Sequence, residues 1–163
     1  MTVPLQRAYI GLGANLGDAQ AALEAACAAL GALPHTHWVA RSGWYRSAPV
    51  DSSGPDYLNG AAAIDTALAP LALLDALLAI EAAHGRERPY RNAPRTLDLD
   101  LLLYGDWVLD TPRLTLPHPR AHLRAFVLRP MAELLPEGDW PGQGPLVDLL
   151  ACVADQRVER LGG

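Results

Sequence analysis

Two aspartates, Asp98 and Asp100, stand one residue apart within a run of leucines. The leucines of residues 97–103 favour a β-strand, in which successive side chains point to opposite faces. On such a strand the two carboxylates share one face, about 7 Å apart along the chain, while alternate leucines share the other. The pattern therefore predicts a central strand with one face in a core and an acidic pair on the other.

An acidic pair of this kind favours a metal ion. Two carboxylates in an apolar setting repel each other and are costly to desolvate, and a bound cation removes both penalties. Oxygen ligands without a cysteine or a histidine pair favour magnesium over zinc, and magnesium commonly completes its shell with phosphate oxygens and water. The alternative is an edge strand that carries two solvated aspartates.

The basic residues point to phosphate. The chain has no lysine, so all 13 basic residues are arginines, and seven of them lie between residues 86 and 124. Guanidinium groups match pairs of phosphate oxygens, so this cluster predicts a phosphate site; a solvated arginine-rich face is the alternative. The net charge of -5 argues against general nucleic-acid binding.

The order of predicted elements indicates the fold. Apolar patterns and breaker residues predict strands over 7–13, 35–46, 57–68 and 97–104, long helices over 19–30 and 70–83, a short hairpin within 106–116, and short helices over 125–135 and 146–153. The order β-α-β-β-α-β with a C-terminal extension is typical of a ferredoxin-like α+β fold. We expect one domain over residues 1–163, with an antiparallel sheet, both long helices on one face, and the other face free to carry a site.

The remaining composition concerns location. No apolar run approaches the length that spans a bilayer, and the N-terminus lacks the pattern of a signal peptide. Cys27 and Cys152 lie in alanine- and leucine-rich segments and are interpreted as small buried side chains. These features predict a cytoplasmic protein with no membrane partner.

Two further motifs are candidates for binding, and a third has the glycines of a binding loop without its other residues. Tyr57 and Asn59 share a strand face, and an aromatic ring beside an amide suits a flat heterocycle, although ordinary sheet packing explains the pair equally well. His118 lies between two prolines, close to several arginines, and is a candidate phosphate contact. The glycine-rich segment 11–17 matches neither a dinucleotide fingerprint nor a lysine-containing phosphate loop, so it predicts a strand-to-helix turn.

Taken together, these motifs resemble the 6-hydroxymethyl-7,8-dihydropterin pyrophosphokinase family of folate biosynthesis. They occur in the family's order and cover residues 7–137. The matching segments are YIGLGANLGD at 9–18, YRSAP at 45–49, PDYLN at 55–59, IE at 80–81 with GR at 85–86, PRTLDLD at 94–100, and PH at 117–118 followed by RAF at 124–126.

The resemblance implies a transferase that moves pyrophosphate from ATP to the hydroxymethyl group of a reduced pterin and releases AMP, with two Mg²⁺ ions. Its expected partners are its small-molecule substrates, ATP and the reduced pterin, and protein partners are left open. The site residues that it implies are Asp98 and Asp100 for metal; Ser47, Val50, Tyr57, Asn59 and Phe126 for the pterin; Glu81, Arg88, Arg95, Arg113, Thr115, His118 and Arg124 for ATP; and Arg86, Arg95, Asp98 and Asp100 for catalysis.

Two other functions are compatible with the fold. A ferredoxin-like domain can bind a small metabolite without turnover, because fold does not determine function. A metal-dependent phosphohydrolase would release phosphate from ATP with no pterin present. The acidic pair beside an arginine cluster favours the pyrophosphokinase over the binding module.

Overall fold

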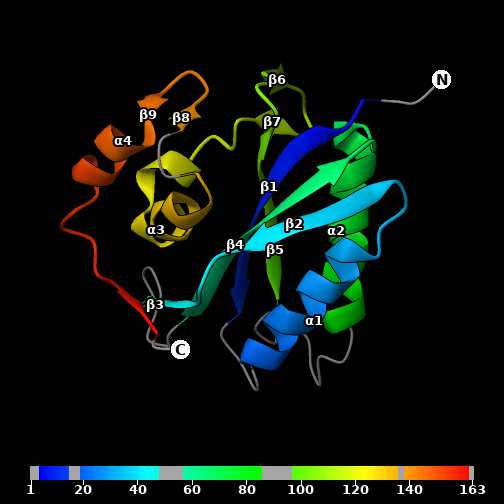
Figure 1. Cartoon of the computed structure of the whole chain (residues 1–163), viewed down its shortest axis with the longest axis horizontal. Helices are drawn as coiled ribbons and strands as arrows, with labels where there is room; N and C mark the ends of the chain where they lie inside the picture. The colour runs from blue at the N-terminus through cyan, green and yellow to red at the C-terminus, as the bar shows by residue number, and fades with distance from the viewer. Residues whose placement is uncertain (1–3, 15–18, 48–56, 86–96, 136–137, 162–163) are drawn as a thin grey trace.

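The computed structural model describes residues 4–14, 19–47, 57–85, 97–135 and 138–161 (Figure 1). Its elements follow in chain order: β1 (Gln6–Ala14), α1 (Ala19–Gly31), β2 (Thr36–Arg41), β3 (Tyr45–Ser47), β4 (Tyr57–Thr66), α2 (Pro70–Gly85), β5 (Asp98–Tyr104), β6 (Leu109–Asp110), β7 (Thr115–Leu116), the 3-10 helix η1 (Ala121–Leu123), α3 (Ala125–Leu134), β8 (Asp139–Trp140), β9 (Gly144–Pro145), α4 (Leu146–Cys152) and β10 (Val158–Arg160). None of the described helices is long and apolar enough to span a bilayer.

The main sheet is antiparallel, which confirms the predicted mixed α+β class. Its strand order is β10-β3-β4-β1-β5, and β2 also pairs with β4. The predicted central position of β5 is wrong, because β5 ends this order. Its leucines are nevertheless buried, since helices cover its faces: Leu99 and Leu101 belong to one core cluster, and Leu102 and Leu103 belong to a second.

Helices cover both faces of the sheet (Figure 1), and each face carries a core cluster. The helices α1 and α2 pack on one face, against alternate residues of β1 such as Ala8, Ile10 and Leu12. The helix α3 packs on the other face, against Tyr9 and its neighbours on β4, and α4 packs beside α3. The expectation that this second face is free is therefore wrong in part. The helix α3 covers the end of this face that carries Tyr9, and the site occupies the rest of the face.

The segment predicted as one strand over 35–46 is divided into β2 and β3. Ser42 uses its hydroxyl to accept the backbone N–H of Ala61 at 2.9 Å, and the N–H of Gly43 donates to Glu133 Oε1 at 3.0 Å. A side chain from α3 thus takes the place of a ladder partner at Gly43. Because Glu133 lies 90 residues away in sequence, local patterns cannot predict this break.

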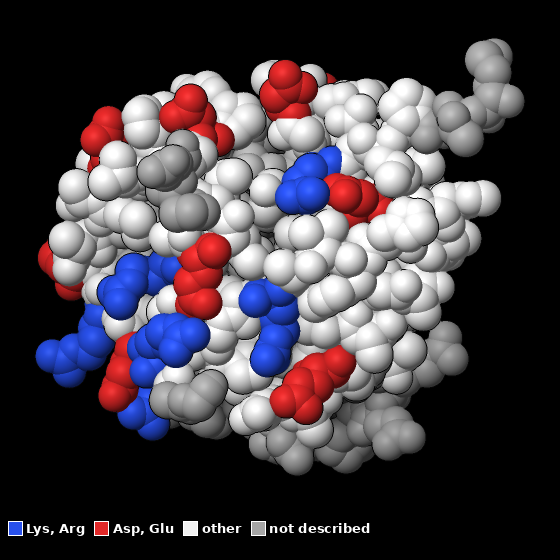
Figure 2. Space-filling model, in the orientation of Figure 1, with Lys and Arg blue, Asp and Glu red and all other residues white. Residues whose placement is uncertain are grey.

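Glu133 joins three parts of the fold. Its carboxylate also accepts hydrogen bonds from the Tyr45 hydroxyl and, at 3.1 Å, from Arg160 Nε on β10. Basic and acidic side chains alternate on the surface at this edge of the molecule (Figure 2). Burial alone would raise the pKa of Glu133, but the hydrogen bonds from Arg160, Tyr45 and Gly43 outweigh it and lower the pKa.

Replacing Glu133 with glutamine is expected to reduce the free energy of unfolding by about 1–2 kcal/mol at neutral pH, since charge-assisted hydrogen bonds are lost. A carboxylate with a lowered folded-state pKa stabilises above its unfolded pKa, and this contribution disappears as pH falls through the folded pKa. The difference between the two proteins should therefore shrink below about pH 4. Urea unfolding across this range measures it; a difference that does not change with pH would contradict the account.

Candidate functional site

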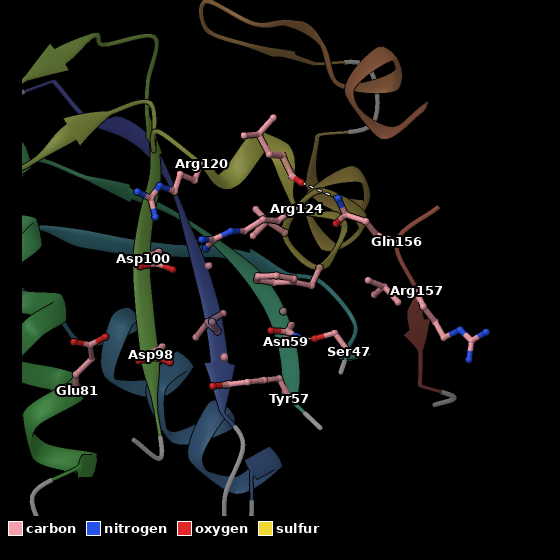
Figure 3. Close-up of a pocket in the computed structure, with 18 residues that line it drawn as sticks. Ser47, Tyr57, Asn59, Glu81, Asp98, Asp100, Arg120, Arg124, Gln156 and Arg157 are labelled. Atoms are coloured by element: carbon pink, nitrogen blue, oxygen red, sulfur yellow. Dashed lines mark hydrogen bonds between the residues drawn. The ribbon is translucent and has the colours of Figure 1, made fainter. Parts of the chain in front are cut away.

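A cleft of about 900 Å³ opens on the sheet face that also carries α3. This volume lies within the range of small-molecule sites. Its walls come from β1, β4 and β5, from the η1–α3 segment, from α2 and from the segment before β10 (Figure 3). Segments far apart in the sequence therefore meet around one cavity.

The floor of the cleft follows from strand register. Asp98 lies opposite Gly13 on β1, which lies opposite Asn59 on β4, and Asp100 lies opposite Gly11. Directly paired residues share a sheet face, so two glycines stand beside the two carboxylates. A Cβ atom at Gly13 would lie 3.4 Å from Asn59 Oδ1. The glycines keep the space between the acidic pair and Asn59 clear of side chains.

The acidic wall contains three carboxylates. Asp98 is half-buried, Asp100 is exposed, and both line the cleft together with Glu81 of α2. Glu81 Oε2 accepts the backbone N–H of Leu99 at 2.7 Å, which fixes α2 to the strand between the two aspartates. Within the described ranges there is no group of three or more His, Cys, Asp or Glu arranged to hold a metal. The donor set fits a hard cation that takes two carboxylates and completes its shell with phosphate and water.

An aromatic and amide subsite lies along β3 and β4. Tyr57, Asn59 and Ser47 line the cleft from the sheet, and Phe126 lines it from the first turn of α3. Asn59 and Ser47 are buried, and Asn59 Nδ2 donates to Ser47 Oγ at 2.7 Å. The hydrogen bond orients the amide beside the aromatic side chains, as a flat polar ring would require.

Basic side chains enter from the η1–α3 segment. Arg120 and Arg124 extend toward β5 near Asp100 (Figure 3). The Arg124 guanidinium lies over the Phe126 ring, 5.7 Å from its centroid. Arg124 therefore lies between Asp100 and the aromatic subsite, where an anionic group linking a metal to a ring would bind, and Arg120 lies on the other side of Asp100 (Figure 3).

His118 does not line the cleft. Its Nδ1 accepts the backbone N–H groups of Arg120 at 3.2 Å and Ala121 at 3.1 Å, so it shapes the turn that carries Arg120. Burial is the largest influence on the His118 pKa and lowers it; Asp100 opposes this effect, while Arg124 and Arg120 add to it. The neutral ring with Nδ1 as acceptor suits this role in the turn.

Other sequence candidates lie elsewhere. Arg113 forms an exposed ion pair with Asp75 of α2, and neither it nor Thr115 of β7 lines the cleft. Val50, Arg86, Arg88 and Arg95 fall outside the described residues. Arg120, a member of the arginine cluster over residues 86–124, also lines the cleft. Gln156 lines it too, but it belongs to no motif and sequence analysis did not select it.

Comparison with known proteins identifies the family. The model of the 7,8-dihydro-6-hydroxymethylpterin-pyrophosphokinase family matches residues 9–136. The chain belongs to this family. Two relatives are named 2-amino-4-hydroxy-6-hydroxymethyldihydropteridine pyrophosphokinase. The one from Pseudomonas aeruginosa is 48% identical over 98% of this chain and 99% of its own length, and the one from Haemophilus influenzae is 42% identical over 94% and 97%.

Solved structures support the fold. The chain is similar to the wild-type HPPK-DHPS of Plasmodium falciparum, with a TM-score of 0.72 and 13% identity over 90% of this chain. It is also similar to an HPPK-DHPS in complex with substrates, with a TM-score of 0.72 and 12% identity over 93% of this chain. In each case the chain spans 44% of the solved chain, less than half its length. The sequence matches therefore confirm the resemblance to the pyrophosphokinase family, and the solved structures share its fold.

Proposed function

We propose that this chain transfers pyrophosphate from ATP to 6-hydroxymethyl-7,8-dihydropterin, giving AMP and the pterin pyrophosphate in folate biosynthesis. The observation that carries the proposal is one cleft in which an acidic pair, two arginines and a ring-sized aromatic and amide subsite adjoin. A pterin is a flat ring with donors and acceptors at its edge, and a triphosphate is the anion that a metal and arginines bind together. A cytoplasmic location remains a prediction of the sequence.

The ring would lie between Tyr57 and Phe126. Tyr57 comes from the sheet and Phe126 from the helix packed on that face, so the two aromatic residues belong to different layers of the fold. Asn59 and Ser47 line the cleft beside them and are joined by the hydrogen bond from the Asn59 amide to the Ser47 hydroxyl. Val50, implied by the family resemblance, would add a backbone contact.

Replacing Tyr57 with alanine is expected to weaken pterin binding about tenfold, because stacking on one face of the ring is lost. ATP affinity should stay within about twofold, since Tyr57 lies on the ring side of the cleft. Tyr57→Phe keeps the ring and should retain most of the affinity. Calorimetry with each ligand separates these effects, and equal losses for ATP and pterin would indicate disruption of the sheet instead.

Asp98 and Asp100 would hold two Mg²⁺ ions, for which their oxygen ligands are suited. Bound Mg²⁺ would neutralise phosphate charge and make a coordinated hydroxyl more acidic. The two carboxylates would orient the triphosphate by fixing the position of the Mg²⁺ charge that it binds. Glu81 supports them by holding β5 through the N–H of Leu99.

The transfer is a displacement at phosphorus. The pterin hydroxyl releases its proton to solvent water and its oxygen forms a bond to the β-phosphorus. The bond from that phosphorus to the bridging α–β oxygen breaks, and AMP leaves with the electron pair. Arg124, together with Arg86 and Arg95 from the sequence, would neutralise charge on the transferred group, while Tyr57 and Phe126 hold the ring in line. Positioning and charge neutralisation are thus the protein's main contributions.

Incubation with ATP, Mg²⁺ and 6-hydroxymethyl-7,8-dihydropterin should give AMP and pterin pyrophosphate in equal amounts, and neither product should form without the pterin. Chromatography of both products tests this. ADP as the main nucleotide product would refute pyrophosphoryl transfer. Phosphate release without pterin would indicate a phosphohydrolase, and ligand binding without product would indicate a binding module.

We also infer that the fold is a ferredoxin-like unit in one domain. If β2 and β3 are taken as two parts of one strand, the order from β5 to β1, β4 and this strand is the order expected for β-α-β-β-α-β. The C-terminal extension then adds α3, α4 and β10. Exchange or proteolysis experiments that show one cooperative unit would support the single domain.

A further inference from the structure

Gln156 connects the C-terminal segment to the site. It lies between α4 and β10, beyond the residues 9–136 that the family model matches, and it lines the cleft. Its Oε1 accepts the backbone N–H of Ala125 at 2.8 Å, and its Nε2 donates to the carbonyl oxygen of Leu123 at 3.0 Å (Figure 3). One side chain therefore binds the backbone on both sides of Arg124.

The backbone at Arg124 needs such support. Arg124 is the N-cap residue of α3, with φ -123° and ψ 119°, and its side chain makes no capping hydrogen bond. The first N–H groups of a helix have no partner within the helix, and a polar side chain at the cap usually accepts one of them. Gln156 supplies that acceptor from 31 residues away in sequence, which leaves the Arg124 side chain available to the cleft.

Gln156 is itself fixed on both sides. Its N–H donates to the carbonyl oxygen of Val153 at 3.0 Å, and Val158, two residues later, pairs with Ser47 of β3. Arg160 then anchors β10 through its ion pair with Glu133. The C-terminal segment thus connects the strand that carries Ser47 to the start of the helix that carries Phe126.

We propose that Gln156 is a positioning residue for the pyrophosphoryl transfer, an inference that rests on the proposed function. It holds Arg124 and Phe126 in place through their backbone and has no direct part in the chemistry. The Arg124 guanidinium lies 5.7 Å from the centroid of the Phe126 ring. A rotation of the backbone at Arg124 would therefore displace both the guanidinium that contacts phosphate and the ring that contacts the pterin. Loss of Gln156 should therefore affect both substrates, unlike loss of Tyr57.

Replacing Gln156 with methionine keeps the volume of the side chain and removes both hydrogen bonds. KM for ATP and KM for the pterin should each rise about fivefold, and kcat should fall about fivefold, because a displaced Arg124 neutralises the transferred group less well. The unfolding midpoint should fall by no more than about 5 °C, as for loss of a helix cap. Gln156→Glu keeps an acceptor for Ala125 and complements the helix dipole, so it should recover part of the loss.

A matched control and a readout without turnover complete the experiment. Gln143→Met makes the same substitution at an exposed glutamine in the turn between β8 and β9, outside the cleft lining, and should leave both KM values unchanged. Amide hydrogen exchange at Ala125 should accelerate in Gln156→Met and stay unchanged in Gln143→Met, whether or not the protein forms AMP. Failure of AMP formation by the unaltered chain would refute the proposed function and leave the exchange result intact.

Two results would overturn the positioning role. KM values within about twofold of the original in Gln156→Met, with slow exchange at Ala125, would show that the two hydrogen bonds are dispensable. An unfolding midpoint lowered by more than about 10 °C, with no recovery in Gln156→Glu, would show that Gln156 supports the whole C-terminal segment and not Arg124 in particular.

Discussion

Replacing Asp98 or Asp100 with alanine is expected to reduce AMP formation by about a thousandfold or more, because the metal proposed to neutralise the triphosphate would lose a ligand. The two carboxylates share the cleft face of β5 and lie beside Gly13 and Gly11, so neither can take over the other's position. Single-turnover formation of AMP at saturating Mg²⁺ measures the loss directly. Calorimetry with a non-reactive ATP analogue should show weakened Mg²⁺-dependent binding in the same variants.

The fold of both variants should be retained. Without metal the two carboxylates repel each other, so removing one should leave the free energy of unfolding unchanged or slightly higher. Asp110→Ala is the matched control, since Asp110 is exposed on β6 and lies outside the cleft lining. Activity close to the original in both Asp98→Ala and Asp100→Ala would exclude a metal role for the pair.

Periodic patterns predicted much of this fold. Alternation of side chains indicated that Asp98 and Asp100 share a face, and helical spacing with Pro70 at the first position indicated α2. Long-range contacts were not predictable in the same way. The pairing of β10 with β3, and the break at Gly43 caused by Glu133, depend on residues from distant parts of the chain.

The position of β5 shows a second limit. Its apolar run indicated a central strand, but an edge strand covered by helices needs the same leucines. Burial of Leu99 and Leu102 reflects packing on the two faces, not the number of neighbouring strands. Sequence therefore predicted which face of β5 is acidic, and could not predict its place in the sheet.

The lining of the cleft was predictable where a motif carried it. Tyr57, Asn59 and the acidic pair stand in recognisable segments, and the structure brings them to one cleft. Gln156 gives no such signal, because its role depends on the backbone of Leu123 and Ala125 and not on its sequence neighbours. Residues that act by holding others in place become visible only with the fold.

Replacing Arg124 with alanine is expected to lower kcat/KM for ATP by about a hundredfold, the loss of about 3 kcal/mol that is typical when a donor to developing charge is removed. Arg124 lies at the start of α3, where partly positive backbone N–H groups also favour an anion. Its guanidinium lies over Phe126, so one side chain contacts both the aromatic subsite and the region near Asp100. The same size of effect is predicted for Arg86 and Arg95, on sequence grounds alone.

The geometry of Arg124 can be separated from its charge. Arg124→Lys keeps the positive charge but loses the planar fork and its packing on the ring, so it should recover only a small part of the lost rate. Arg7→Ala removes an exposed arginine that pairs with Asp65, away from the cleft, and should leave kcat/KM unchanged. Rapid-quench measurement of AMP formation with a binding isotherm for an ATP analogue distinguishes a loss of rate from a loss of affinity. If Arg124→Ala resembles Arg7→Ala in both measurements, the phosphate role of Arg124 is excluded; if Arg124→Lys restores the full rate, charge alone is sufficient and the contact with Phe126 has no part in transfer.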